Sequence, residues 1–387
     1  MASSLDHAAF VARCEALALD LAARADEAEE LRRLPDATLD DARRHELLTA
    51  VVPTALGGHG LGLDALAQGT RTLAHGCPAS AWTLSFLMLH GWLLARFPED
   101  GRAELFAAGP EVLAPAPLAP TGTANAVEGG YRVTGRWEWA TGVAHGAWVL
   151  VHAVEVGPEL RTVFVAVPRT EVEVDDVWFT SGMRATGSNT VRIDDVFVPA
   201  HRAIPATSLL LDAEPLAGDG MAGHPVAAVL ALVAAAPALG AAEAAVDLFR
   251  GRLAERVLAY SLGDRQREQP AAQVRLATAM SDLTSARVRW DTAIRDLVAD
   301  CASGGADEAR RVASRLAAAA TVRASRSVIG TVCEGAGASV YLSTSPLQRL
   351  QRDVEVLKGH VIFDWDRTAE LAGRFALGFA LRPTDLV

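Results

Sequence analysis

Apolar residues recur at helical spacing over most of the chain, with one long interruption in the middle. Helical patterns cover residues 5–33, 64–76 and 79–97. From about residue 110 to 205 the pattern switches to alternation of apolar and polar positions, and Gly, Pro, Val and Thr become frequent. Alternation is typical of half-buried strands, whereas recurrence every three to four residues is typical of amphipathic helices. The chain therefore passes from helix to sheet and back to helix.

The alternating region contains several short strand patterns separated by turn residues. The strands expected are 131–137, 148–156, 162–167, 172–178 and 191–198. Four long Ala-rich helical segments follow, at 224–260, 269–302, 307–333 and 346–380. Long helices with short links predict a bundle, and short strands at this spacing predict a small antiparallel barrel or sandwich.

The expected fold class is α+β with several domains. The predicted layout is an N-terminal α-helical domain over residues 1–110, a central antiparallel β-barrel or sandwich over 111–212 and a C-terminal four-helix bundle over 213–387. A bundle that meets a sheet leaves an interdomain cleft, which is a common place for a small-molecule site.

Composition narrows the classes of function. The chain has 387 residues and a formal net charge of −11, which argues against nucleic acid as a partner because phosphate binding needs a basic face. The apolar run Val226–Leu239 is short and interrupted by Pro237, so it reads as a buried helix and no membrane span is expected. Four scattered cysteines and a start without a signal-peptide pattern indicate a cytoplasmic protein without a metal site.

Two histidines lie on apolar helical faces and are candidates for acid–base chemistry. His360 follows an apolar stripe that begins after Ser345-Pro346, and Asp364 is expected one turn later on the same helix. His90 shares a face with Trp82 and Phe86 in the segment 79–97. A histidine beside an apolar face can act as a base with a tuned pKa, although burial for packing alone explains either residue equally simply.

Two further segments resemble a known family. Trp137-Glu138-Trp139-Ala140-Thr141-Gly142 looks like the flavin-contact loop of the acyl-CoA dehydrogenase fold. The run from Ser181 through Gly182-Met183-Arg184-Ala185-Thr186-Gly187-Ser188 to Val198-Pro199 looks like the signature of that fold. The order of helical domain, β-domain and bundle is also similar, so the resemblance covers nearly the whole chain.

The C-terminal segment decides between branches of this superfamily. Acyl-CoA dehydrogenases usually carry a catalytic glutamate where this chain reads Gly359-His360-Val361-Ile362. The segment is instead similar to the oxygenase subunits of two-component flavin-dependent monooxygenases. That resemblance implies three catalytic residues, His360, Thr141 and His90, with His360 as the base that deprotonates the substrate. It also implies reduced FAD or FMN and O2 as cofactors, reacting through a flavin C4a-hydroperoxide, and a separate NAD(P)H:flavin reductase.

The same resemblance implies a set of cofactor-binding residues and an assembly. The set comprises Trp139, Thr141, Gly142, Arg184, Ser188, Gly335 and Gly337. A turn or packing role is equally expected for the last four. The substrate implied is an aromatic or similarly nucleophilic small molecule, and the implied assembly is a homotetramer. Two alternatives stay open: an acyl-CoA dehydrogenase with a base relocated to Glu243 or Glu255, and a scaffold that has lost catalysis.

Overall fold

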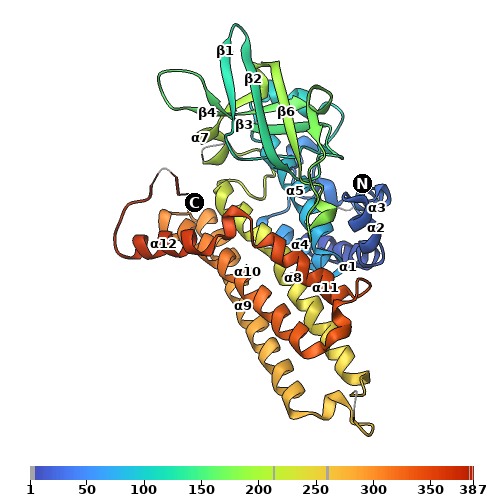
Figure 1. Cartoon of the computed structure of the whole chain (residues 1–387). Helices are drawn as coiled ribbons and strands as arrows, with labels where there is room; N and C mark the ends of the chain where they lie inside the picture. Colours follow the sequence, from blue (N-terminus) through green and yellow to red (C-terminus); the bar gives the residue numbers. More distant parts are fainter. Residues whose placement is uncertain (1–4, 212–213, 259–260, 383, 386) are drawn as a thin grey trace.

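The chain forms a sheet that stands on a helical body, as Figure 1 shows. The structure is a computed structural model, and it describes residues 5–211, 214–258, 261–382, 384–385 and 387. The N-terminal helices lie between the sheet and the upper part of the C-terminal bundle, whose long helices extend downward in Figure 1. The predicted order of helices, sheet and helices is confirmed.

Six α-helices form the N-terminal part over the residues that the structure describes. They are α1 (His7–Ala23), α2 (Ala25–Leu31), α3 (Asp36–Arg44), α4 (Leu63–Gly76), α5 (Pro78–Leu94) and α6 (Glu99–Leu105). The single helix predicted over 5–33 is wrong, because the chain breaks at Arg24, whose ψ of 7° is not helical. Every residue of α5 is buried, since its sequence is apolar on all sides and its Thr83 and Ser85 hydroxyls donate to carbonyls of the helix itself.

The middle of the chain folds into one seven-stranded sheet. Its strands are β1 (Gly122–Val127), β2 (Gly130–Ala140), β3 (Trp148–Glu155), β4 (Thr162–Pro168), β5 (Glu173–Asp175), β6 (Asn189–Pro199) and β7 (Ala203–Pro205). The order is β5-β6-β2-β1-β3-β4-β7, and β1 pairs with β3 in parallel while the other pairs are antiparallel. The sheet is therefore mixed, which corrects the expectation of purely antiparallel pairing.

The C-terminal part contains three long helices and a broken fourth. After α7 (Ala206–Leu210) come α8 (Val226–Glu255), α9 (Pro270–Ala302) and α10 (Glu308–Ala336). Within the described residues α8 is the one helix long and apolar enough to cross a membrane, and 89% of its most apolar stretch is buried inside the protein. It packs between α4 and α10, so its apolar side chains are buried in the protein core.

The fourth segment departs from the prediction of a continuous helix over 346–380. It consists of α11 (Pro346–Leu357), a single 3₁₀ turn at Val361–Phe363 and α12 (Trp365–Ala376). His360 lies in the break, where its ring accepts from the backbone N–H of Ile362, and Asp364 caps α12. Asp364 therefore does not follow His360 on one helical face as the sequence pattern predicted.

The packing divides into two cores. One runs without interruption through the N-terminal helices and the bundle, and the other fills the sheet. Trp137 of β2 lies in the sheet core with its indole N–H donating to the His152 carbonyl at 2.7 Å. Trp137, the first residue of the motif that resembles a flavin-contact loop, is therefore fully buried in the sheet. The site described next lies where the two cores meet.

Candidate active site

Three side chains on one face of α5 form a buried aromatic row. Trp82, Phe86 and His90 follow one another at four-residue spacing, which puts them in line on a helix. The ring centroids of Trp82 and Phe86 are 4.7 Å apart, and those of Phe86 and His90 are 5.5 Å apart. The face predicted from the sequence is therefore present, and it is oriented toward the other candidate residues.

His360 reaches this row from the break between α11 and α12. Its ring lies edge-on to Trp82 at a centroid distance of 5.5 Å and contacts Phe363 at 5.9 Å. His360 as a whole residue is exposed in the single chain. Its ring is nevertheless desolvated by its neighbours, and this desolvation, together with the positive charge of Arg315, lowers the pKa of His360 to about 4. His360 is therefore neutral near pH 7. Its Nδ1 accepts from the Ile362 N–H at 3.3 Å, so the neutral ring carries its hydrogen on Nε2.

His90 differs from His360 in its hydrogen bonding. Its ring makes a hydrogen bond with the Ala114 backbone that favours the protonated ring, and Nδ1 is buried without a partner. Among the described residues, Nδ1 of His90 therefore has no hydrogen-bond partner. Burial lowers the pKa of His90 to about 4 despite that hydrogen bond. A buried ring nitrogen without a partner is available for a hydrogen bond with a ligand.

Thr141 meets the aromatic row from the end of β2. The Trp82 indole N–H points at the Thr141 hydroxyl oxygen at 3.4 Å, and that oxygen lies 2.9 Å from the Ser188 hydroxyl. The Gly142 N–H donates to the Thr186 carbonyl at 2.9 Å, which fixes the loop after β2 against the loop before β6. Trp82 thus joins the two predicted catalytic residues Thr141 and His360.

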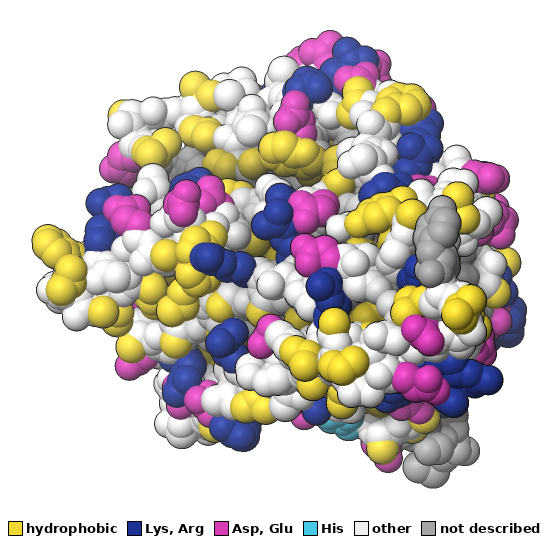
Figure 2. Space-filling model, turned by 60° about the horizontal axis from the view of Figure 1, so that its bottom comes forward, with side chains coloured by type: hydrophobic (Ala, Val, Ile, Leu, Met, Phe, Trp, Pro, Cys, Tyr) yellow, Lys and Arg dark blue, Asp and Glu magenta, His cyan; other side chains and the backbone are white. Residues whose placement is uncertain are grey.

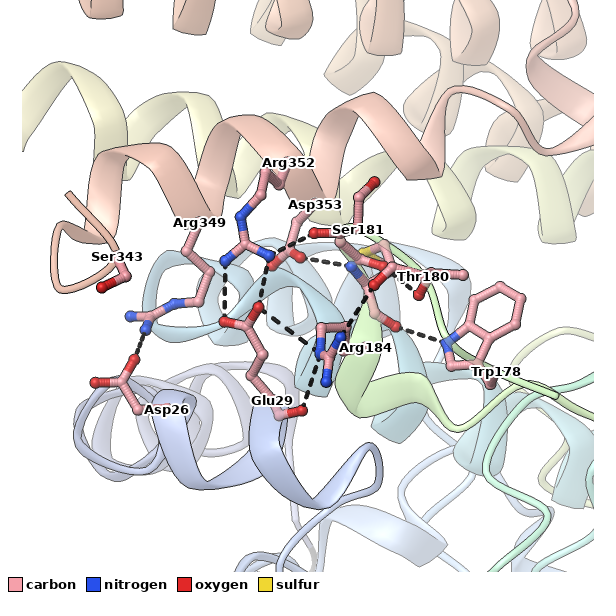
Figure 3. Close-up of polar contacts among 12 residues, drawn as sticks. Asp26, Glu29, Trp178, Thr180, Ser181, Arg184, Ser343, Arg349, Arg352 and Asp353 are labelled. Atoms are coloured by element: carbon pink, nitrogen blue, oxygen red, sulfur yellow. Dashed lines mark hydrogen bonds and ion pairs between the residues drawn. The ribbon is translucent and has the colours of Figure 1, made fainter. Parts of the chain in front are cut away.

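The loop before β6 is anchored to the bundle by a polar cluster. The buried Asp353 carboxylate of α11 accepts from the Met183 N–H at 2.6 Å, and Arg352 holds both carboxylate oxygens of Glu29 at 2.5 and 3.1 Å (Figure 3). Burial raises the pKa of Asp353 to about 7. Gly182 has no room for a side chain, because a Cβ would lie 2.2 Å from the Arg352 carbonyl oxygen. The cluster fixes the distance between α11 and the Thr186–Ser188 segment.

The comparisons with known proteins agree on one family. Residues 232–365 match the family model described as acyl-CoA dehydrogenase, C-terminal domain. A pigment production hydroxylase of a Rhodococcus species is 33% identical over 370 residues, covering 94% of this chain and 95% of the relative. The oxygenase subunit HsaA of a flavin-dependent monooxygenase from Rhodococcus jostii is 30% identical over 383 residues, covering 96% of this chain and 99% of the relative.

The chain belongs to the flavin-dependent monooxygenases of the acyl-CoA dehydrogenase fold. Solved structures agree with this assignment. The 3-HSA hydroxylase from Rhodococcus sp. RHA1 has a TM-score of 0.90 and 28% identity, covering 99% of this chain and 100% of that one. XiaF from Streptomyces sp., solved with FADH2 and glycerol, has a TM-score of 0.90 and 27% identity, covering 97% and 96%. The resemblance stated from the sequence motifs is confirmed.

The residues at the end of β2 fit a monooxygenase's flavin. Trp139 has a φ of 64°, which an L-residue rarely adopts, and its side chain is 61% exposed. An exposed indole held by a strained backbone offers a flat apolar surface to a planar ring. Thr141, two residues later, offers a polar atom beside it, and Gly142 has the positive φ of 72° that the turn needs. These three residues of the predicted set are together.

Three other predicted cofactor residues do not lie in this loop: Arg184 belongs to the anchoring cluster, and Gly335 and Gly337 lie at the end of α10. The Arg184 guanidinium donates to the carbonyls of Glu29 and Thr180 at 3.2 and 3.3 Å, within the anchoring cluster of Figure 3. Gly335 and Gly337 are at the C-terminal end of α10, where a Cβ would collide with Arg275 and Arg256 respectively. In a single chain these two glycines therefore lie beside Arg256 and Arg275, and not in the loop that carries Thr141.

The structure also locates the residues of the rival dehydrogenase hypothesis. Glu243 of α8 forms ion pairs with Arg71 of α4 at 3.2 Å and with Arg287 of α9 at 3.9 Å. Glu255 is the last residue of α8. Within the part of the chain that the structure describes, no contact joins either carboxylate to the Trp82 row, so the observed pairing gives no support to a relocated base.

Sequence reasoning missed two contributors to the site. Trp82 was identified only as a neighbour of His90, although it contacts both Thr141 and His360. Thr186 was treated only as part of a motif, although its hydroxyl lies 2.7 Å from that of Ser188. The alternation of Thr186 and Ser188 in the signature segment, on either side of Gly187, was the available signal.

Proposed function

We propose that this protein is the oxygenase component of a two-component flavin-dependent monooxygenase that hydroxylates a phenol or a similarly nucleophilic aromatic molecule. The observation that carries the proposal is the convergence of His90, Thr141 and His360 on the Trp82–Phe86 pair. These three residues come from distant parts of the sequence, and each of them contacts Trp82 or Phe86. Relatives are named resorcinol hydroxylase and p-hydroxyphenylacetate 3-hydroxylase, which supports a phenolic substrate.

Reduced flavin, when bound, supplies the two electrons with which one atom of O2 enters the substrate and the other leaves as water. The protein's part is to hold the aromatic ring and control its proton. Trp82 and Phe86 provide an apolar wall for a planar substrate. A dry wall also limits water near the reacting atoms, which reduces the side reaction that releases peroxide.

His90 is the better candidate for the proton acceptor. Among the described residues its Nδ1 has no hydrogen-bond partner, whereas Nδ1 of His360 already accepts from the Ile362 N–H. We therefore assign acceptance of the substrate's hydroxyl proton to His90. His360 then donates from Nε2 to the substrate oxygen as negative charge grows there. The sequence-based assignment of the base to His360 stays a prediction, and it requires the ring to give up its hydrogen bond with Ile362.

Variants of the two histidines separate these assignments. His90→Ala is expected to lower hydroxylation about 100-fold or more, the usual contribution of a positioned general base. His360→Gln keeps a donor and should retain more activity than His360→Ala. The exposed His75, which pairs with Asp247 at 3.2 Å, supplies the control variant His75→Ala. A His90→Ala protein with normal turnover would remove His90 from the chemistry.

Trp139, Thr141, Gly142 and Ser188 are proposed to hold the flavin ring, with Arg184 supporting their loop from behind. Gly335 and Gly337 are proposed to let the flavin phosphates approach. The neighbouring guanidiniums of Arg252 and Arg256 both donate to the Ala336 carbonyl. Within the described residues neither arginine has a carboxylate partner, and an unneutralised pair of this kind suits a phosphate.

A homotetramer would explain why the two parts of this cofactor set are far apart in one chain. In such an assembly a second copy would supply its Gly335–Gly337 segment. Exposed apolar side chains along α9 (Val274, Met280 and Val288) support an interface there. Apolar and charged side chains are interspersed on the face seen in Figure 2.

The remaining expectations belong to this proposal. The three-domain layout 1–110, 111–212 and 213–387, closure of the sheet into a barrel, and a cytoplasmic location are retained from the sequence. A separate NAD(P)H:flavin reductase is proposed because relatives are named oxygenase subunits and components. Both FAD and FMN are retained as the reduced flavin.

One titration distinguishes the proposal from its rivals. The protein is mixed with chemically reduced FAD or FMN, O2 and a panel of phenols, and hydroxylated product and H2O2 are both counted. Product formation supports the proposal, whereas peroxide alone with every phenol opposes it. Bleaching of bound flavin by an acyl-CoA without O2 would indicate a dehydrogenase. Absence of flavin binding in both redox states would indicate a scaffold.

A further inference from the structure

Three hydroxyls form a continuous chain behind the flavin-contact loop. The Thr186 hydroxyl donates to the Met183 carbonyl at 2.9 Å and lies 2.7 Å from the Ser188 hydroxyl. Ser188 lies 2.9 Å from Thr141, whose oxygen also receives the Trp82 N–H at 3.4 Å. Thr186 and Ser188 are 1% and 5% exposed, so water does not substitute for these contacts.

Counting hydrogens shows which direction of this chain satisfies most contacts. Each hydroxyl has one hydrogen to donate, and an indole N–H only donates. The carbonyl of Met183 only accepts, so the hydrogen of Thr186 is used there. Ser188 must then donate to Thr186, and Thr141 must donate to Ser188. This is the arrangement that satisfies every contact at once, and it leaves Thr141 with a lone pair and no hydrogen for a ligand.

The reverse direction is possible at the loss of one hydrogen bond. If Thr186 donated to Ser188, and Ser188 to Thr141, the Thr141 hydrogen would be available to a ligand. The Met183 carbonyl would lose the Thr186 hydroxyl but keep two donors, the Trp178 indole at 3.0 Å and the Thr186 backbone N–H at 3.2 Å. Reversal therefore weakens the chain without leaving a buried group unpaired.

This direction matters because flavin changes hydrogen-bonding character with its redox state. The N5 atom of the isoalloxazine carries a hydrogen in reduced flavin and only a lone pair in oxidised flavin. An acceptor at Thr141 suits the reduced form, whereas the oxidised form requires the reversed chain. We propose that Thr186 and Ser188 are positioning residues that make the site select reduced over oxidised flavin. This inference rests on the proposed function, in which Thr141 contacts the reactive edge of the flavin.

Equilibrium binding tests the inference without turnover. Dissociation constants for oxidised flavin, and for reduced flavin under anaerobic conditions, are measured by quenching of tryptophan fluorescence. Ser188→Ala frees the Thr141 hydrogen, so the ratio of the oxidised to the reduced constant should fall about fivefold, the effect of about one ordinary hydrogen bond. Thr186→Val frees the hydrogen of Ser188 to reverse the chain, and it should lower the same ratio.

Two controls complete the experiment. Thr141→Ser keeps the hydroxyl and should keep the wild-type ratio. Ser85→Ala removes another buried hydroxyl of α5 that bonds only its own helix, to the Trp82 carbonyl at 2.9 Å, and should leave the ratio unchanged. The inference would be overturned if Ser188→Ala and Thr186→Val weakened binding of oxidised and reduced flavin equally, or if the ratio of the two dissociation constants stayed unchanged. Wild-type protein that binds neither form of flavin would instead overturn the proposed function on which it rests.

Discussion

Replacement of Asp353 by Asn should increase the stability of the protein relative to the wild type, and this increase should grow as pH rises. The carboxyl group is 4% exposed and accepts from the Met183 N–H at 2.6 Å. Desolvation is the main cause that raises its pKa to about 7, and the Glu29 carboxylate adds to it, while the Met183 hydrogen bond and the guanidiniums of Arg352 and Arg349 oppose it. Asn keeps an oxygen for Met183 but has no proton to release.

The sign and size follow from proton linkage. An unfolded Asp has a pKa of about 3.9, so between about pH 4 and pH 7 the unfolded chain has released a proton that folded Asp353 still holds. Stability of the wild type therefore falls as pH rises through this window and levels off above pH 7. A difference of about three pH units corresponds to about 4 kcal/mol in full, and about 2–3 kcal/mol of it falls between pH 5 and pH 8.

The assay is urea unfolding of both proteins at pH 5 and pH 8 at one protein concentration. The stability of Asp353→Asn minus that of the wild type should be larger at pH 8 by about 2–3 kcal/mol. Asp307→Asn is the control, since Asp307 is an exposed helix cap that also accepts a backbone N–H, from Arg310 at 2.8 Å. An Asp353→Asn difference that does not change with pH would refute burial as the dominant influence on this carboxyl.

Three further predictions concern the site and its support. Gly182→Ala should lower the free energy of unfolding by about 1–3 kcal/mol in urea, because the new Cβ would meet the Arg352 carbonyl at 2.2 Å; unchanged stability would contradict the close approach. Trp139→Gly relieves a backbone φ of 64° and should change stability by less than about 1 kcal/mol while weakening reduced-flavin binding about fivefold; unaltered binding would exclude ring contact. The acid limb of kcat/KM should lie below pH 5, because the pKa values of His90 and His360 are both about 4, and a limb near pH 6.5 would contradict their desolvation.

Much of the fold could be predicted because its signals are local. The switch from helical to alternating periodicity located the sheet, and four-residue spacing put Trp82, Phe86 and His90 on one face. Strand pairing is not local, so the parallel contact of β1 with β3 could not be read from either strand alone. The break before α12 was also missed, because Asp364 reads as a helix interior residue until its capping bond to the Arg367 N–H is seen.

The candidate site shows the same division. Motif resemblance supplied Thr141 and His360 but could not supply their contacts with Trp82, which depend on tertiary packing. The protonation of His90 and His360 also depends on backbone contacts that form only in the folded chain, with Ala114 and with the Ile362 N–H. Residue type therefore indicated the candidate side chains, and the contacts of the folded chain showed which of them lie together.

The most direct test of the proposed function follows the oxygen atom. The protein is supplied with chemically reduced flavin, ¹⁸O2 and the best phenol from the panel, and the product is analysed by mass spectrometry. The account predicts one ¹⁸O atom in each hydroxylated product, with product yield falling and H2O2 rising in His90→Ala. Product oxygen derived from water, or release of all the oxygen as H2O2 with every phenol, would contradict it.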